Sequence, residues 1–305
     1  MAQDPRPPLS VPPSSVFPIQ QAAWSRVRRQ WDQRGAPWLH AEVARRMSER
    51  LPLIRQAPEC IVDWEPQGGG TVWEAQRFPR QATLHPAPGT PSDRTPKGWW
   101  GRLRQKWRGS DGRLPIEPSL PPGQADLVWS NMGLHTSADP EAVMAQWLGA
   151  LKVEGFLMFS TFGPDTLREL SEVWRIRGWG PAAQPFVDMH DWGDALVQAG
   201  FADPVMDQET IRLSWANPEA AVQELRTLGR NAHRDRFAGC RTPAWRARMQ
   251  QALSDLAGPD GRVSLSFEVI YGHAFKPQPR PAVAATTTVS LEDMRAMVQS
   301  TRGRN

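Results

Sequence analysis

Hydrophobic positions recur every fourth residue in two segments of the chain, and this spacing places them on one face of an α-helix. The first segment reads AEVARRMSERLPLI and the second reads PEAVMAQWLGALK. Residues typical of helix starts and ends, such as Pro164 with Asp165 and the later Gly200, extend the prediction. Helical segments are predicted at 20–55, 140–152, 164–176, 189–201 and over much of 218–256.

Other segments have the pattern of β-strands. Residues 155–163 form an unbroken apolar run, as expected for a strand that is covered on both faces. Two later segments alternate apolar and polar residues, which is typical of half-exposed antiparallel strands. Strands are predicted at 60–62, 81–85, 113–117, 125–131, 155–163, 209–215 and 263–275.

The order of these elements predicts an α/β fold. Strands and helices alternate before a final antiparallel pair of strands, which indicates a doubly wound, mostly parallel sheet with an antiparallel edge hairpin. In such sheets, ligands bind at the carboxyl ends of the strands. Because Asp63, Glu117, Asn131 and Thr161 end or follow predicted strands, we expect them to line one crevice.

Composition sets the domain boundaries. Residues 1–18 are rich in proline and serine and are predicted to be a disordered tail. Residues 19–277 are predicted to form one domain, with a helical, lid-like, arginine-rich insertion at 218–256, and 278–305 to form a second tail.

The sequence excludes several classes of protein. No run approaches 18 apolar residues, so a transmembrane helix is not expected, and the first residues lack the pattern of a secretory signal. The two cysteines, Cys60 and Cys240, provide neither a disulfide framework nor a zinc site. We therefore expect a cytoplasmic protein without a metal ion.

Positive charge is concentrated in two segments, within a net charge of +4. Residues 94–108 carry six basic residues and no acidic one, beside three tryptophans. We expect this segment to cover the sheet, with contact to a membrane surface or to single-stranded nucleic acid as alternatives. Arg226, Arg230 and Arg234 are spaced by four and are expected to share a helix face, which suits an acidic partner or simply faces solvent.

Four segments of the chain together resemble a known family. They read DLVWSNMGLH, LKVEGFLMFSTFGPDTLREL, FVDMHDWGDALVQAGFADPVMDQETIRLSW and SFEVIYGHAFKP. They resemble the malonyl-acyl-carrier-protein O-methyltransferases of biotin synthesis, which are class I S-adenosylmethionine-dependent methyltransferases. The resemblance covers about residues 24–277 and is strongest from residue 126 onward.

The resemblance implies a Rossmann-like methyltransferase sheet, S-adenosylmethionine as cofactor and acidic acyl carrier protein as partner. It also implies methyl transfer to the free carboxylate of a malonyl group. A carboxylate is already a nucleophile, so the reaction requires positioning and exclusion of water rather than a general base. No catalytic side chain is predicted for this reason.

The resemblance also places a cofactor loop in the stretch CIVDWEPQGGGT. The family pattern is an acidic residue followed by glycine at every second position, and here Glu65 and Gln67 stand at two of the glycine positions. A shifted register that uses the three consecutive glycines is an alternative. The candidate cofactor-binding residues are Asp63, Gly68, Gly69, Gly70, Glu117 and Asn131.

The candidate substrate-binding and carrier-binding residues are His190, Arg226, Arg230 and Arg234. A capping or packing role is the alternative for the histidine. Two functions remain open for the whole chain. One is the active methyltransferase, with another small acid as a variant substrate. The other is a non-catalytic pseudo-methyltransferase that has lost cofactor binding and acts as a binding or regulatory protein.

Overall fold

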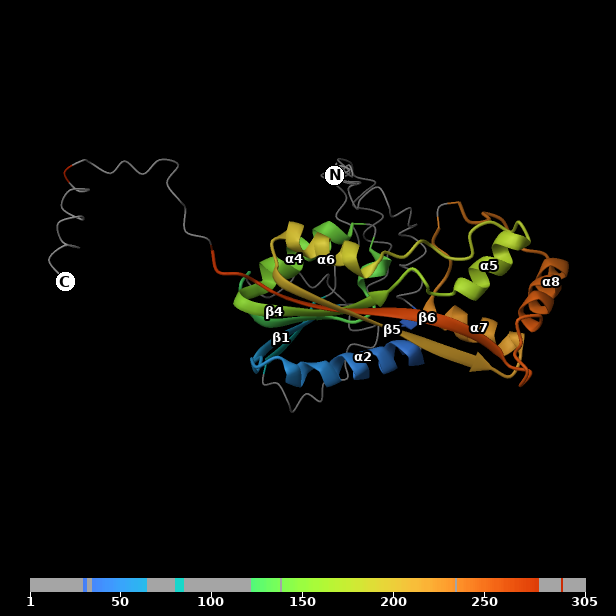
Figure 1. Cartoon of the computed structure of the whole chain (residues 1–305), viewed down its shortest axis with the longest axis horizontal. Helices are drawn as coiled ribbons and strands as arrows, with labels where there is room; N and C mark the ends of the chain where they lie inside the picture. Colours follow the sequence, from blue (N-terminus) through green and yellow to red (C-terminus); the bar gives the residue numbers. More distant parts are fainter. Residues whose placement is uncertain are drawn as a thin grey trace, which may run out of the picture.

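A six-stranded sheet flanked by helices forms the centre of the molecule (Figure 1). This computed structural model describes residues 30–31, 35–64, 80–84, 122–137, 139–233, 235–279 and 292. The strands are β1 (Cys60–Trp64), β2 (Arg80–Leu84), β3 (Ala125–Ser130), β4 (Leu151–Phe162), β5 (Ala202–Trp215) and β6 (Val263–Phe275). The helices are α2 (Trp38–Arg50), α4 (Pro140–Ala150), α5 (Arg168–Ile176), α6 (Met189–Ala199), α7 (Pro218–Leu228) and α8 (Pro243–Ser254), with short 3-10 turns η2 (Leu51–Leu53) and η4 (Leu134–Thr136).

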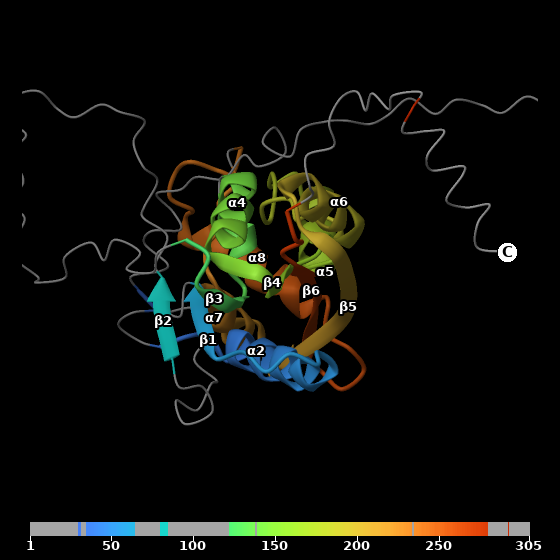
Figure 2. The ribbon, with the colours of Figure 1, turned by 90° about the vertical axis from the view of Figure 1, so that its left-hand side faces the viewer.

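The strand order is β2-β1-β3-β4-β6-β5 (Figure 2). The first four strands in this order are parallel, whereas β6 runs antiparallel to both of its neighbours, β4 and β5. The predicted doubly wound sheet with an antiparallel edge hairpin is therefore confirmed. The connection after β1 leads to β2 on one side, whereas the connection after β3 leads to β4 on the other side, which makes the gap between β1 and β3 a topological switch point. The strand predicted at 113–117 lies outside the described residues.

Helix α2 covers one face of the sheet, and α4 with α6 covers the other (Figure 1). Of the three positions in the predicted stripe, Leu51 lies beyond α2 in η2 and is only partly buried. Val43 and Met47 are fully buried on α2, as is Leu39 one turn before them. Their burial removes apolar surface from water and holds the helix against the sheet.

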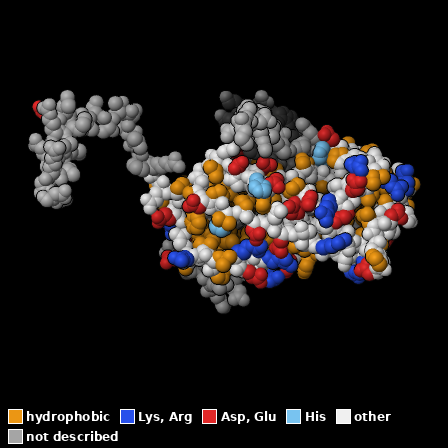
Figure 3. Space-filling model, viewed as in Figure 1, with side chains coloured by type: hydrophobic (Ala, Val, Ile, Leu, Met, Phe, Trp, Pro, Cys, Tyr) orange, Lys and Arg blue, Asp and Glu red, His pale blue; other side chains and the backbone are white. Residues whose placement is uncertain are grey.

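The outer face of α2 carries charges of both signs (Figure 3). Arg46 forms an ion pair of 2.6 Å with Glu209 on β5, and Arg50 forms one of 2.8 Å with Asp207 on the same strand. The hydroxyl of Tyr271 on β6 also donates to Glu209, at 2.6 Å. These contacts join the helix to the antiparallel part of the sheet.

Several predicted boundaries are wrong. The helix predicted at 20–55 is interrupted at residues 35–37, and α2 ends at Arg50. Strand β5 begins at Ala202, seven residues before the predicted start at 209.

Helix α4 ends at Ala150 because Leu151 already pairs with Ala125 in the sheet, so β4 begins four residues before the predicted strand. Helix α5 begins at Arg168 rather than near Pro164, because Leu167 has a left-handed backbone conformation with φ of 57°. The predicted capping position of Asp165 therefore falls in a turn ahead of the helix.

The arginine-rich insertion contains two helices, α7 and α8. The prediction that Arg226 and Arg230 share a helix face is wrong. Helix α7 ends at Leu228, and Gly229 follows it with φ of 155°. Arg234 lies outside the described residues. Helices α5, α7 and α8 gather at the end of the molecule that is farther from α4 and α6 (Figure 1).

Candidate functional site

Asp63 lies near the carboxyl end of β1, at the switch point of the sheet. Its side chain is buried with 6% exposure, and its Oδ1 atom has no hydrogen-bond partner in the described part of the chain. Burial raises the pKa of Asp63 to about 7, because the protein interior disfavours the charged carboxylate. A buried carboxylate oxygen without a partner is suited to receive a positively charged or hydrogen-bonding group of a ligand.

Asn131 follows the neighbouring strand β3 at the same edge of the sheet. Its side-chain amide donates to the carbonyl oxygen of His40 at 2.9 Å, and its Oδ1 accepts a hydrogen bond from Ser160 at 2.9 Å. These bonds tie α2, β3 and β4 together. The structure thus gives Asn131 a part in holding the edge of the crevice, and its predicted contact with a cofactor stays a prediction.

A pocket of about 550 Å³ lies beyond the carboxyl end of β4, among α5, α7 and α8. We call it the acceptor pocket. Its polar lining includes three buried residues, which are His135, Thr166 and Gln184, and three residues after or at the end of α7, which are Arg226, Arg230 and Asn231. Apolar side chains make up most of the remaining wall, among them Phe162, Leu170, Trp174, Val222, Leu225 and Phe267.

His135 is a pocket residue that the sequence analysis missed. Its side chain is 3% exposed, its Nδ1 lies 3.3 Å from the hydroxyl of Thr161, and its backbone carbonyl accepts a hydrogen bond of 2.9 Å from Gln184. Its ring also packs against Phe162, with 4.7 Å between ring centroids. The signal that would have found it is its place four residues after Asn131, in the segment that follows β3.

Thr161, which was expected in the crevice, is fully buried on β4 and reaches the site through His135. The two residues link the strand ends to the acceptor pocket. Thr161 thus lies next to the pocket, whereas Asp63 and Asn131 are not among the residues that line it.

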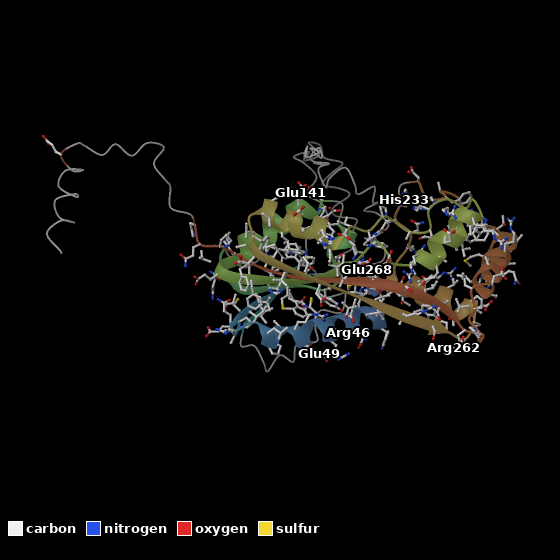
Figure 4. All side chains as sticks on the ribbon, in the orientation of Figure 1. Arg46, Glu49, Glu141, His233, Arg262 and Glu268 are labelled. Carbon is white, nitrogen blue, oxygen red and sulfur yellow. The ribbon has the colours of Figure 1, made fainter. Side chains whose placement is uncertain are left out.

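The loop between β4 and α5 forms one wall of the pocket and is held by Glu268 of β6 (Figure 4). The Glu268 carboxylate accepts a hydrogen bond of 2.7 Å from the backbone N–H of Asp165. The hydroxyl of Thr166 donates to the Glu268 carbonyl oxygen at 3.0 Å. A Cβ at position 163 would lie 2.5 Å from the Glu268 carboxylate, so a larger residue there would displace this carboxylate from its hydrogen bond with the loop.

Arg226 and Arg230 both line the pocket, although they do not share a helix. Both side chains are exposed, so they place positive charge at the rim of the pocket rather than in its interior. This is the part of the predicted basic surface that the structure brings to the site.

His190 lies in the first turn of α6 and does not line the acceptor pocket. Asp188 accepts hydrogen bonds from its backbone N–H at 2.8 Å and pairs with its ring Nδ1 at 2.6 Å. This is the capping arrangement that the sequence left as an alternative, and a contact with substrate stays a prediction. The other candidates, Gly68, Gly69, Gly70, Glu117 and Arg234, lie outside the described residues.

The described residues offer no cluster of three or more His, Cys, Asp or Glu side chains that would hold a metal ion. Among the same residues, no helix combines the length and the apolar character that crossing a membrane requires.

The sheet order and the site at its switch point define the class of this protein, a doubly wound, Rossmann-like α/β protein. No protein-family model matches the chain. Curated relatives identify its family within that class, and the chain belongs to the malonyl-[acyl-carrier protein] O-methyltransferases.

The relative from Laribacter hongkongensis is 38% identical over 274 residues, which cover 84% of this chain and 91% of that protein. The relative from Gallionella capsiferriformans is 36% identical over 271 residues, which cover 85% and 90% respectively. Both are named malonyl-[acyl-carrier protein] O-methyltransferase. A solved SAM-dependent methyltransferase from Archaeoglobus fulgidus is a more distant match, with 12% identity and a TM-score of 0.40 over 78% of this chain and 94% of that one, and it adds nothing to the assignment.

Proposed function

We propose that this protein is an S-adenosylmethionine-dependent methyltransferase that esterifies the free carboxylate of malonyl-acyl carrier protein. The observation that carries the proposal is the similarity to enzymes named for this reaction, which extends over 91% of the length of the Laribacter protein. The acceptor pocket supplies a location for the reaction, because it lies beside the strand ends where doubly wound sheets bind their ligands.

Among the described residues, Asp63 has the chemistry to contact such a cofactor. Asp63 presents a buried carboxylate oxygen that has no partner within the described chain. A cationic group of the cofactor would supply the missing partner and would favour the charged form of the carboxylate. When bound, S-adenosylmethionine supplies an electrophilic methyl group carried on a positively charged sulfur.

The protein contributes to the reaction by orienting the acceptor carboxylate and by excluding water. His135 and Gln184 present buried polar groups to the acceptor pocket, where they would orient the acceptor carboxylate. The surrounding apolar walls exclude water and thereby strengthen these polar interactions. Since the carboxylate attacks without losing a proton, none of these residues needs to act as a base.

The rim arginines support an acidic partner. Arg226 and Arg230 lie where a carrier protein would have to approach to place its acyl group in the pocket. Positive charge at the rim would speed the encounter with an acidic carrier protein, and the effect would weaken as salt is added.

Calorimetric titration with S-adenosylmethionine and with its demethylated product, S-adenosylhomocysteine, tests the cofactor. We expect saturable binding of both at micromolar concentrations, followed by methyl transfer when malonyl-acyl carrier protein is added. Flat traces for both compounds would overturn the proposal in favour of the non-catalytic alternative. That alternative rests on Glu65 and Gln67, which lie outside the described residues, and a variant with glycine at both positions would then test whether this loop alone prevents binding.

A further inference from the structure

Thr161 contacts the imidazole of His135 without lining the acceptor pocket itself. The Thr161 hydroxyl lies 3.3 Å from Nδ1 of His135, and the two residues are 0% and 3% exposed. His135 lines the pocket, whereas Thr161 does not. The threonine can therefore influence a ligand in the pocket only through the histidine.

Aromatic packing and backbone hydrogen bonds hold the imidazole in place. Its centroid lies 4.7 Å from that of Phe162 and 5.9 Å from that of Phe186, and both of these rings also line the pocket. The carbonyl oxygen of His135 accepts a hydrogen bond of 2.9 Å from the side chain of Gln184. Because the ring is held from several sides, its Nδ1 edge stays against the Thr161 hydroxyl.

The hydroxyl of Thr161 has one hydrogen-bond partner within the described part of the chain, and that partner is His135. It can donate its proton to Nδ1, or it can accept a proton from Nδ1. In the second arrangement, the hydroxyl proton would be buried without an acceptor, which costs free energy. The first arrangement is therefore favoured, and it requires that Nδ1 carries no proton.

The hydrogen bond at one ring nitrogen determines which group the other nitrogen presents. A neutral imidazole carries a single proton, so a ring that accepts at Nδ1 has its N–H at Nε2. His135 is then a hydrogen-bond donor in a pocket whose other walls are mostly apolar. A carboxylate is the kind of group that gains most from such a donor, because charge strengthens the hydrogen bond.

We propose that Thr161 is a positioning residue, whose hydroxyl holds His135 in the Nε2–H tautomer so that this ring donates a hydrogen bond to the carboxylate of the methyl acceptor. The inference rests on the proposed function and deepens it by naming the group that prepares the pocket histidine. Neither residue gives up or takes a proton in the reaction. A donor to one carboxylate oxygen leaves the other oxygen to attack the methyl group.

Nitrogen-15 NMR of the histidine side chains tests the tautomer in the cofactor-free full chain at pH 8. Long-range correlation spectra distinguish a ring nitrogen that carries a proton from one that does not. The variant His135→Phe assigns the His135 signals among the six histidines, with His135→Ala as its replacement if it does not fold. We expect a protonated Nε2 and a bare Nδ1. A proton on Nδ1 would overturn the inference, whether or not the protein transfers methyl groups.

Two variants at position 161 separate the hydroxyl from the shape of the side chain. Thr161→Ser should keep the wild-type tautomer, whereas Thr161→Val should give a mixture of both tautomers, because it lacks the donor. The matched control is Thr136→Val, which removes another buried hydroxyl, one that donates to the Gly133 carbonyl oxygen at 2.7 Å. This control should leave the tautomer unchanged. Spectra of Thr161→Val that match those of the wild type would contradict the proposed role.

Steady-state kinetics with malonyl-acyl carrier protein test the effect on the reaction. We expect Thr161→Val to lower kcat about tenfold, since the acceptor is less well oriented, and Thr161→Ser to restore most of this loss. In a His135→Phe background, Thr161→Val should have almost no further effect, because the hydroxyl acts through the imidazole. An equal loss in both backgrounds would mean that Thr161 serves only the structure of β4, and the inference would be wrong.

A ligand titration of the wild type tests the contact with the acceptor and needs no variant that folds. Addition of S-malonyl pantetheine together with S-adenosylhomocysteine should shift the signal of the Nε2 proton to higher frequency, as a hydrogen bond to a carboxylate does. An unmoved signal at saturation would overturn the role of His135 and with it that of Thr161. A wild type that methylates no malonyl-acyl carrier protein contradicts the proposed function instead, and the tautomer of the cofactor-free protein still decides what Thr161 does.

Discussion

The carboxylate of Glu268 accepts a hydrogen bond from the backbone N–H of Asp165, although 103 residues separate the two in the sequence. Glu268 is buried on β6, and the loop that it holds carries Thr166 and Leu167 into the lining of the acceptor pocket. The position of one pocket wall therefore depends on a strand that lies much later in the sequence.

Replacing Glu268 tests this dependence. We expect Glu268→Ala to lower the free energy of unfolding by about 2 kcal/mol, since its side-chain hydrogen bond is lost and the part-buried N–H of Asp165 loses its partner. The loosened loop should also raise KM for malonyl-acyl carrier protein. Glu268→Gln is the matched control, because its amide oxygen still accepts the hydrogen bond. Urea unfolding and steady-state kinetics check both effects, and equal behaviour of the two variants would contradict them.

Two glycines in regular elements should respond to alanine in opposite directions. At Gly272 on β6, an added Cβ would overlap the ring of Phe159, which is fully buried. Gly272→Ala should therefore lower the free energy of unfolding by about 1–3 kcal/mol. At Gly149 in α4, no atom lies within 4 Å of the added Cβ, so Gly149→Ala should raise it by about 0.5–1 kcal/mol. Urea unfolding measures both. A Gly272→Ala variant that is as stable as the wild type would show that packing at Gly272 is looser than described, and a Gly149→Ala variant that is less stable would contradict the expectation for α4.

The buried carboxylate of Asp63 should make the stability of the cofactor-free protein depend on pH. The pKa of Asp63 is raised by burial from 3.8 to about 7, so the folded protein holds this proton between about pH 4 and pH 7 while the unfolded chain releases it. The free energy of unfolding should thus fall across this window, by up to about 4 kcal/mol from this residue, and level off above pH 7.

Asp63→Asn cannot ionise and should remove this decline. Urea unfolding at pH 5 and pH 8 measures it, and the exposed Asp194→Asn on α6 is the control that should keep the decline seen in the wild type. A wild-type slope that survives Asp63→Asn would mean that other groups cause it. In calorimetry, the same variant should bind S-adenosylmethionine at least tenfold more weakly at pH 8, because the negative charge at the switch point is absent.

The rim arginines should affect the encounter with the carrier protein more than the chemical step. We expect the double variant Arg226→Ala, Arg230→Ala to raise KM for malonyl-acyl carrier protein about tenfold at low salt, with a smaller change in kcat. The difference from the wild type should shrink as salt rises. Arg246→Ala with Arg248→Ala removes the same charge from exposed positions on α8 that do not line the pocket, and a similar loss in that control would point to net charge alone.

Local patterns were enough to predict the sheet and several helices. The spacing of Val43 and Met47 identified the buried face of α2, and the alternation in residues 263–275 correctly indicated an antiparallel strand. The expected half-exposure of that strand is wrong, because β6 lies between β4 and β5 and is buried on both faces. These features depend on the period of hydrophobic residues, which a sequence displays directly.

The features that were missed depend on distant contacts or on single backbone angles. The start of α5 is set by the left-handed conformation of Leu167 and by the hydrogen bond to Glu268. The residue types at positions 164–167 indicate neither of these features. The spacing of Arg226 and Arg230 was correct for one helix face, but Gly229 ends the helix between them. His135 was overlooked because its pocket forms only when α5 and α7 are packed beside the strand ends.

The position of β6 has a consequence for how the protein folds. It lies between β4 and β5, yet it is the last of the described strands to be synthesised. Until residues 263–275 leave the ribosome, β4 keeps an unpaired edge and β5 has no partner strand among the described strands, so both are open to pairing with other chains. The sheet is thus completed by a late pairing between segments distant in sequence, which is a slow kind of event, and a chain that stops before Val263 should aggregate rather than fold.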